Sequence, residues 1–470
     1  MLFNSPDFLF FFLPIFLAFY YILGRAFSNS ILLIASLAFY FVTSGELTFI
    51  LLLSVVFNWA LSLRLVQVKK QSGRHWLLII GLVVNIAPLL YYKYAVFFLG
   101  ALNDAFAFFG LPLDLPAIHP PLPIGISFFT FQAVSYIVDI ARSRIAPARR
   151  LVDFGMYHSC FPQLVAGPIV RYEEIATEVV SRKLLLYDIH NGIVQFCFGL
   201  GKKVVLADTV GRIADAAFLL PDGGRGFLAA WLGIVAYSLQ IYFDFSGYSD
   251  MAIGLGRMLG FHFPENFDQP YLSRSVTEFW RRWHLTLSHW FRDYVYIPLG
   301  GNRCGMLSTL RNLLIVFFLC GLWHGAAYTF VIWGLLHGGL LIAERVGRSL
   351  TKLRPLASFS WGYTIVAVMC AWVFFRADTP TKAVHYLADM ISVQNFNLPD
   401  EMLSDLTPDR ILFFMVAIIM AITPYQRFFH FNEARYAFGA GASIASLIVA
   451  VYATIMLSVN GFSPFIYFRF

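Results

Sequence analysis

Runs of apolar residues separated by short polar loops recur along the whole of this 470-residue chain. A straight membrane-spanning helix needs about 20 apolar residues, and several of the runs are shorter than that. We therefore predict an all-α, polytopic transmembrane helical fold in which some helices are tilted, short or re-entrant. The predicted segments lie near residues 8–23, 31–43, 48–64, 76–92, 124–140, 190–207, 228–243, 313–328, 329–344, 361–375, 411–424 and 442–459.

Basic residues gather in a few of the connecting segments, which is typical of loops that stay in the cytoplasm. These segments are 64–74, 142–150, 274–303 and 345–354. Loops 99–123 and 377–410 are mainly acidic and are therefore predicted to face outward. The pattern predicts about twelve crossings with both termini outside, provided that 311–345 crosses the membrane twice.

We interpret residues 1–470 as one integral-membrane domain, with a cytoplasmic amphipathic segment at 274–303 and an outer loop at 377–410. The first apolar run follows Asp7 and has no basic start, which favours a retained span over a signal peptide. Pro and Gly interrupt residues 154–170, and such backbone is tolerated at membrane depth only where protein or water covers it. A re-entrant loop is predicted there.

Composition narrows the possible classes of protein. Hydrophobic residues make up 59% of the chain and charged residues only 13%, which excludes an ordinary soluble domain. The net charge of +7 lies in short loops, so we expect no nucleic-acid partner. The cysteines lack a CxxC pair or a metal-like spacing, so we expect no disulfide framework and no metal site. They are Cys160, Cys197, Cys304, Cys320 and Cys370.

The apolar run 313–336 contains one acidic, basic or histidine side chain, His324. An ionisable group inside a membrane span is costly, so it suggests a functional site, although a buried histidine bonded to a neighbouring helix remains possible. Cys320 lies four residues earlier, on the same helical face, so a Cys–His nucleophile pair is conceivable beside the commoner inert buried cysteine. His337 is expected to support helix packing.

When residues 279–292 are projected on a helix, four of them fall on one largely aromatic stripe. We predict an amphipathic helix at the cytoplasmic interface, with its aromatic rings toward the acyl boundary. His284 falls at the border of the stripe and His289 on the wet face, so His284 is the functional candidate. A plain interfacial anchor with solvated histidines is the alternative. The stripe consists of Trp280, Trp283, Leu287 and Trp290.

Two polar groups of residues could bind substrate. Arg281 and Arg282 could collect the phosphates of a nucleotide-like donor, or equally anionic lipid headgroups. Asp244 and Ser246 follow the apolar run 228–243 and could orient a histidine or bind hydroxyls, or could simply end a helix. The GxSxG spacing of a nucleophile elbow is absent.

Four strings in order, YFDFSGYSDMAIG, EFWRRWHLTLS, YIPLGGNR and GLWHG, resemble the membrane-bound O-acyltransferase (MBOAT) family, and its bacterial alginate O-acetyltransferase-like branch most closely. The resemblance covers nearly the whole chain. It implies helices around a central membrane-embedded catalytic site, in which His324 is the catalytic histidine and His284 the second functional one. The remaining candidates, for binding the substrate or donor, are Arg281, Arg282, Ser288, Trp323, Asp244 and Ser246.

The resemblance also implies the reaction. An acetyl group would pass from a cytoplasmic thioester, acetyl-CoA or another, across the bacterial inner membrane to hydroxyls of an alginate-like exopolysaccharide. A periplasmic acetyltransferase or another exopolysaccharide-modification protein could carry the final step. His324 would act as general base, and His284 would orient the donor or polarise its carbonyl. The protein would be multi-pass and surrounded by membrane lipids, with no tightly bound cofactor.

Two other classes of protein are compatible with the sequence. A transporter or polymer-export channel also has broken helices and polar residues at the membrane midplane. Against it, no inverted repeat is visible and intramembrane ionisable residues are few. A structural scaffold in a secretion complex is the third possibility.

Overall fold

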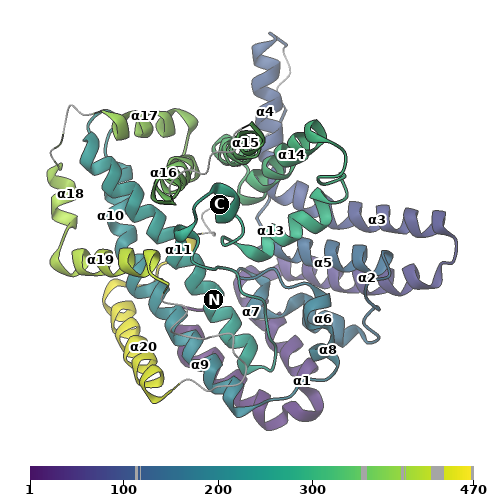
Figure 1. Cartoon of the computed structure of the whole chain (residues 1–470). Helices are drawn as coiled ribbons and strands as arrows, with labels where there is room; N and C mark the ends of the chain where they lie inside the picture. The colour runs from purple at the N-terminus through teal and green to yellow at the C-terminus, as the bar shows by residue number, and fades with distance from the viewer. Residues whose placement is uncertain are drawn as a thin grey trace. The chain divides into compact units, whose positions relative to one another are not determined.

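The structure is a computed structural model, and it describes residues 1–111, 115–116, 118–350, 357–392, 396, 398–424 and 439–466. Parts of three predicted loops, 112–114, 351–356 and 393–395, lie outside the described residues. The ordered elements among the described residues are all helical, with no strand (Figure 1). The prediction of an all-α fold is confirmed.

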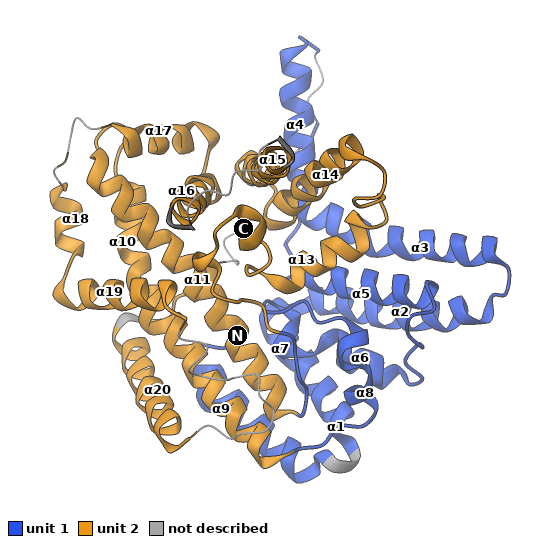
Figure 2. Ribbon diagram, viewed as in Figure 1, with its two compact units in different colours: residues 1–184, 260–264 blue, residues 185–259, 265–470 orange. Residues whose placement is uncertain are grey.

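The chain divides into two compact units, which Figure 2 shows in different colours. Unit 1 comprises Met1–Leu184 and Gly260–Pro264, and unit 2 comprises Leu185–Leu259 and Glu265–Phe470. All candidate site residues belong to unit 2. That residues 1–470 act as one domain stays a prediction.

Unit 1 carries the first eight α-helices. The predicted broken segment 154–170 consists of the end of one short helix, a second helix of four residues and non-helical backbone, and nearly all of it is buried. The helix is therefore interrupted in this segment and protein covers its backbone, as predicted. That the segment is re-entrant stays a prediction. The helices are α1 (Leu13–Ser44), α2 (Thr48–Gln67), α3 (Gln71–Leu89), α4 (Ala95–Phe108), α5 (Ile126–Ala141), α6 (Leu151–Ser159), α7 (Phe161–Leu164) and α8 (Tyr172–Val180).

Unit 2 holds the remaining helices, and the predicted outer loop 377–410 contains two of them, α17 and α18. The helices are α9 (Leu186–Gly201), α10 (Asp208–Leu219), α11 (Gly226–Met258), α12 (Val276–Phe279), α13 (Leu285–Phe291), α14 (Met306–His324), α15 (Tyr328–Leu350), α16 (Ala357–Arg376), α17 (Pro380–Ile391), α18 (Asp400–Asp405), α19 (Pro408–Ile422) and α20 (Ala440–Asn460). A π-helical segment, η4 (Lys202–Ala207), joins α9 to α10.

Helices α9 and α11 pack backbone to backbone in unit 2. A Cβ added at Gly192 would lie 2.6 Å from the carbonyl oxygen of Gly254, and one at Gly199 would lie 2.6 Å from that of Gly247. Small residues permit such close approach between membrane helices. This contact positions α11, which carries Asp244 and Ser246.

Each of the twelve predicted segments is largely helical in the structure. Eight helical stretches among the described residues are long and apolar enough to cross a membrane, and one of them, Phe27–Gln67, includes two predicted segments. The other three predicted segments correspond to the shorter helices α5, α9 and α19. The chain is a multi-pass membrane protein, and its sidedness stays a prediction.

Residues 311–345 form a helical hairpin, as the charge argument required. Residues 325–327 leave the helix between α14 and α15. A Cβ at Gly321 would lie 2.3 Å from the oxygen of Phe330, and one at Gly334 would lie 2.2 Å from that of Phe317, so the two helices run antiparallel in close contact. His324 is therefore the last residue of α14, beside the turn, and does not lie in the middle of one long span.

The prediction of a continuous amphipathic helix over 279–292 is wrong. His284 adopts left-handed backbone geometry with φ of 43°, which ends the turn after α12 before α13 begins. The stripe of Trp280, Trp283, Leu287 and Trp290 is buried, so these rings pack within the protein and do not face the acyl boundary. His289 is exposed, as predicted.

Candidate active site

His324 lies in an aromatic enclosure at the end of α14. Its imidazole is 4.9 Å from the ring of Trp323, 4.9 Å from that of Trp333 and 5.1 Å from that of Phe375, measured between centroids. The residue is only 3% exposed. Aromatic rings from α14, α15 and α16 thus surround this imidazole.

Backbone pairing holds His284 in its left-handed conformation. The N–H of Leu285 donates to the carbonyl oxygen of Asn266 at 3.0 Å, and the N–H of Asp268 donates to that of Arg282 at 2.9 Å. A non-glycine residue in this region is strained by about 1–2 kcal/mol, and such strain is concentrated at functional sites. The turn directs the His284 side chain inward, where it is 0% exposed.

Asn266 fixes the orientation of the His284 ring. Its Oδ1 lies 2.9 Å from Nδ1 of His284 and also accepts bonds from the hydroxyl and the backbone N–H of Thr286. A backbone N–H can only donate, so the atom facing His284 must be the amide oxygen. Nδ1 of His284 therefore carries the proton.

The other nitrogen of His284 is consequently a lone-pair acceptor. Burial lowers the pKa of His284 to about 3, so the ring is neutral near pH 7. Its Nε2 is buried and has no hydrogen-bond partner within the described ranges. The site thus holds a neutral imidazole with a defined tautomer at His284.

One indole connects the two histidines. The ring of Trp323 lies 5.8 Å from His284 and 4.9 Å from His324. The ring of Phe245, from α11, lies 4.7 Å from His284 on another side. The structure therefore brings both predicted histidines and Trp323 into a single cluster.

His337 has a packing role, as expected. Its Nδ1 accepts a bond from Nε1 of Trp280 at 3.2 Å, and its ring packs against Trp333. The Trp280 and Trp333 rings also contact each other. Through Trp333 this group supports the enclosure around His324.

The predicted donor-binding residues separate into two groups. Arg281 and Ser288 line a cavity of about 270 Å³ together with Arg292 and Cys320. Arg282 instead bonds Glu278 at 2.9 Å and Asp268 at 3.4 Å, which stabilises the turn before His284. Cys320, which also lines the cavity, lies one helical turn before His324.

Asp244 and Ser246 lie inside α11, so the alternative that they end a helix is wrong. Asp244 is 2% exposed, bonds Nζ of Lys203 at 2.8 Å and accepts the N–H of Ile466 at 2.7 Å. Among the residues described, the side chain that hydrogen-bonds His284 is Asn266. Asp244 therefore anchors η4 and the segment after α20.

Sequence analysis missed Asn266, Trp333 and Phe375. Asn266 lies 18 residues before His284, in a loop whose polar residues resemble an ordinary connection. Trp333 and Phe375 look like membrane aromatics because both lie in apolar helices. Only the fold brings these residues together around the histidines.

The chain is similar to known proteins along its whole length. The model of the membrane-bound O-acyltransferase family matches residues 148–379, a range that includes His284 and His324. A probable alginate O-acetylase of Azotobacter vinelandii is 39% identical over the full length of both chains. Another, of Pseudomonas aeruginosa, is 44% identical over 87% of this chain and 78% of its own.

A peptidoglycan O-acetyltransferase of Helicobacter pylori is 36% identical over 85% of this chain and 81% of its own. These relatives modify different polymers by transferring the same kind of group. Full-length similarity to them, together with the family match over residues 148–379, means that the chain belongs to the membrane-bound O-acyltransferase family.

Proposed function

We propose that the protein transfers an acetyl group from a cytoplasmic thioester, through the inner membrane, to hydroxyls of an alginate-like exopolysaccharide. The transfer is direct or passes through a periplasmic acetyltransferase. One observation carries this proposal: two buried imidazoles, His284 and His324, pack against the same indole of Trp323. Membership of an acyltransferase family favours this chemistry over transport without reaction.

His324 is the general base in this mechanism. It takes the proton of the acceptor hydroxyl as the oxygen attacks the thioester carbonyl. The tetrahedral intermediate then expels the thiolate, which receives that proton from His324 and leaves as a thiol. General base catalysis of this kind is typically worth about 10²–10⁴-fold.

His284 has a different task because its proton is on Nδ1. The Nε2 atom can accept a hydrogen bond but cannot donate one, so it cannot polarise the thioester carbonyl. We therefore propose that Nε2 of His284 accepts a hydrogen bond from an N–H or O–H of the acyl donor or of the acceptor, and so orients that group. This replaces one of the two roles expected from the sequence, polarisation of the carbonyl.

The thioester is proposed to enter through the 270 Å³ cavity. Arg281 and Arg292 line it together with apolar side chains and with Cys320, which lies one helical turn from His324. Guanidinium groups suit the phosphates of a donor such as acetyl-CoA, and the apolar wall suits its pantetheine arm. The positive charge of 274–303 supports a cytoplasmic position for this opening.

The test uses the full chain purified in detergent, with radiolabelled acetyl-CoA and mannuronate oligomers and without an ion gradient. We expect acetyl ester on the sugar, and a loss of at least about 10²-fold in His324→Ala. The matched control is His158→Gln, which removes another buried imidazole, in unit 1, but keeps a polar side chain for Ser54. Undiminished transfer by folded His324→Ala would exclude the general-base role.

A further inference from the structure

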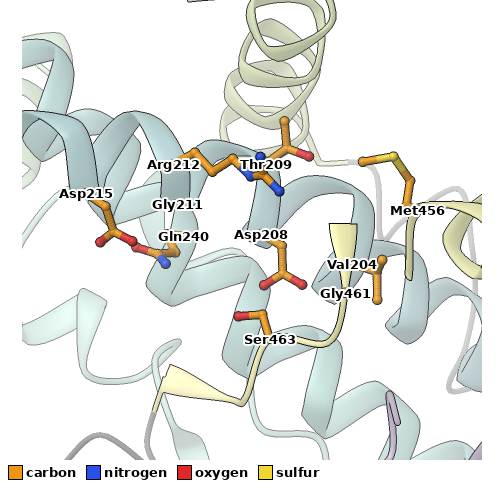
Figure 3. Close-up of a pocket in the computed structure, with 10 residues that line it drawn as sticks. All are labelled: Val204, Asp208, Thr209, Gly211, Arg212, Asp215, Gln240, Met456, Gly461 and Ser463. Carbon is orange, nitrogen blue, oxygen red and sulfur yellow. The ribbon is translucent and has the colours of Figure 1, made fainter. Parts of the chain in front are cut away.

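A second, polar cavity of about 130 Å³ lies in unit 2. It shares no lining residue with the cavity that Arg281 and Arg292 line, which we call the arginine-lined cavity. The polar cavity is formed by α10, the middle of α11 and the chain that follows α20 (Figure 3). A single water needs only about 10–15 Å³ of such space, so this cavity accepts a ring-sized molecule. Its polar lining consists of Asp208, Thr209, Arg212, Asp215, Gln240 and Ser463.

Two of these side chains are deeply buried, and each has an oxygen that lacks a hydrogen-bond partner among the described residues. Thr209 is 5% exposed and Gln240 is 9% exposed. Neither Oγ1 of Thr209 nor Oε1 of Gln240 has a hydrogen-bond partner within the part of the chain that the structure describes. Native proteins rarely leave buried polar atoms unsatisfied, so these two atoms indicate a site for a hydrogen-bonding ligand.

Gly211 makes room for the Gln240 amide at the wall of the cavity. A Cβ at position 211 would lie 2.4 Å from Nε2 of Gln240. The amide therefore packs directly over the α10 backbone.

The carboxylates of the cavity are already held by cations. Asp208 bonds Nζ of Lys203 at 2.5 Å and faces Ser463, and Asp215 bonds Arg376 at 2.7 Å (Figure 3). Burial disfavours the Lys203 ammonium, but Asp244 and Asp208 outweigh this and raise its pKa. Opposite charges are thus balanced around the cavity, which presents many hydrogen-bonding atoms without a strong net charge.

The same ion pairs connect the cavity to the histidines. Lys203 also bonds Asp244, the neighbour of Phe245, whose ring packs on His284. Arg376 follows Phe375, whose ring packs on His324. Arg376 also precedes the predicted outer loop 377–410, so the predicted topology puts the cavity on the side from which an extracytoplasmic acceptor would approach.

We propose that this cavity binds a sugar unit of the acceptor, recognised as a polyhydroxylated ring. The proposal rests on the proposed function and names its acceptor class. A sugar offers several hydroxyls, each able to donate and accept, and the cavity offers six polar side chains for them. A seryl hydroxyl of a partner protein would use only one or two of these groups.

The first test measures binding without catalysis. Full-length His324→Ala protein in detergent is titrated with tetramannuronate and with the neutral cellotetraose. Thr209→Val is nearly isosteric. Added to His324→Ala, it should raise the Kd of whichever sugar binds by about threefold to tenfold, which corresponds to the loss of one neutral hydrogen bond. The control is Thr364→Val, because that buried hydroxyl bonds the Ser360 carbonyl of its own helix.

Unchanged affinity in Thr209→Val, or no binding of either sugar, would overturn the cavity proposal. Stronger binding of N-acetylserinamide than of the sugars would overturn it too, in favour of a seryl acceptor. The second test separates this proposal from acetyl transfer itself. In the otherwise wild-type enzyme, Thr209→Val should raise the KM for the sugar and leave the KM for acetyl-CoA unchanged.

If transfer occurs and neither KM changes, the cavity proposal fails while the proposed function stands. If sugars bind as expected and no acetyl is transferred, the proposed function fails instead.

Discussion

The amide oxygen of Asn266 lies 2.9 Å from Nδ1 of His284, and this contact determines which nitrogen of the ring is free to accept a proton or a hydrogen bond. Thr286 fixes the amide by donating its backbone N–H to the same oxygen. In turn, Nδ2 of Asn266 donates to Oγ of Ser249 at 3.1 Å, which joins the loop to α11. The ring is therefore orientated by a chain of hydrogen bonds that reaches the core of unit 2.

Replacing Asn266 with Asp should make the activity sensitive to acid. A carboxylate beside Nδ1 stabilises the imidazolium, so it raises the pKa of His284 from about 3 toward neutrality. Activity that needs neutral His284 is then lost as pH falls through the raised pKa. We expect a new acid limb in kcat/KM between pH 8 and 5, compared with the same assay on Asn103→Asp, a matched charge change in unit 1. An identical pH profile in the two variants would contradict the assigned tautomer.

The buried neutral state of His284 should also make the protein less stable in acid. The folded-state pKa is about 3 and the unfolded value about 6.5, so the unfolded chain binds the proton first as pH falls. Stability is complete above about pH 6.5 and is lost below it, by about 1.4 kcal/mol per pH unit from this one group. Melting temperatures at pH 7.5 and 5.0 should therefore differ less in His284→Gln than in wild type. An equal difference would show that other groups dominate.

Cys320 is predicted to be dispensable for the chemistry. It lies in the arginine-lined cavity one helical turn from His324, and a cysteine can play a purely apolar part there. Cys320→Ala should keep kcat within about threefold, whereas the bulkier Cys320→Phe should raise the KM for acetyl-CoA by filling the cavity. Folded but inactive Cys320→Ala would support an acyl-cysteine intermediate, and mass spectrometry would then detect the thioester.

The sequence sufficed for the helical class and the α14–α15 hairpin, because these follow from apolar runs and loop charge. Family motifs selected His324 and His284, which the structure places against one indole. It failed where distant residues determine the backbone. The break at His284 depends on bonds to Asn266 and Asp268, which periodicity over 279–292 cannot detect. The same reasoning explains Asp244, whose partners Lys203 and Ile466 lie far away in the sequence.

The contacts of Asp244 predict a role in stability and not in substrate binding. Its carboxylate is buried against Lys203 and holds the backbone N–H of Ile466, so Asp244→Asn leaves the lysine with Asp208 as its remaining anion. Breaking a buried ion pair typically costs about 3–5 kcal/mol, and the Asp208 contact should reduce this loss. We expect a clearly lower melting temperature, with the KM for acetyl-CoA unchanged in the folded fraction.

Asp378→Asn, which breaks the exposed pair with Lys382, is the control and should leave the melting temperature unaltered. If the KM for acetyl-CoA rises while the melting temperature is unaltered, Asp244 takes part in binding the donor and this prediction is wrong.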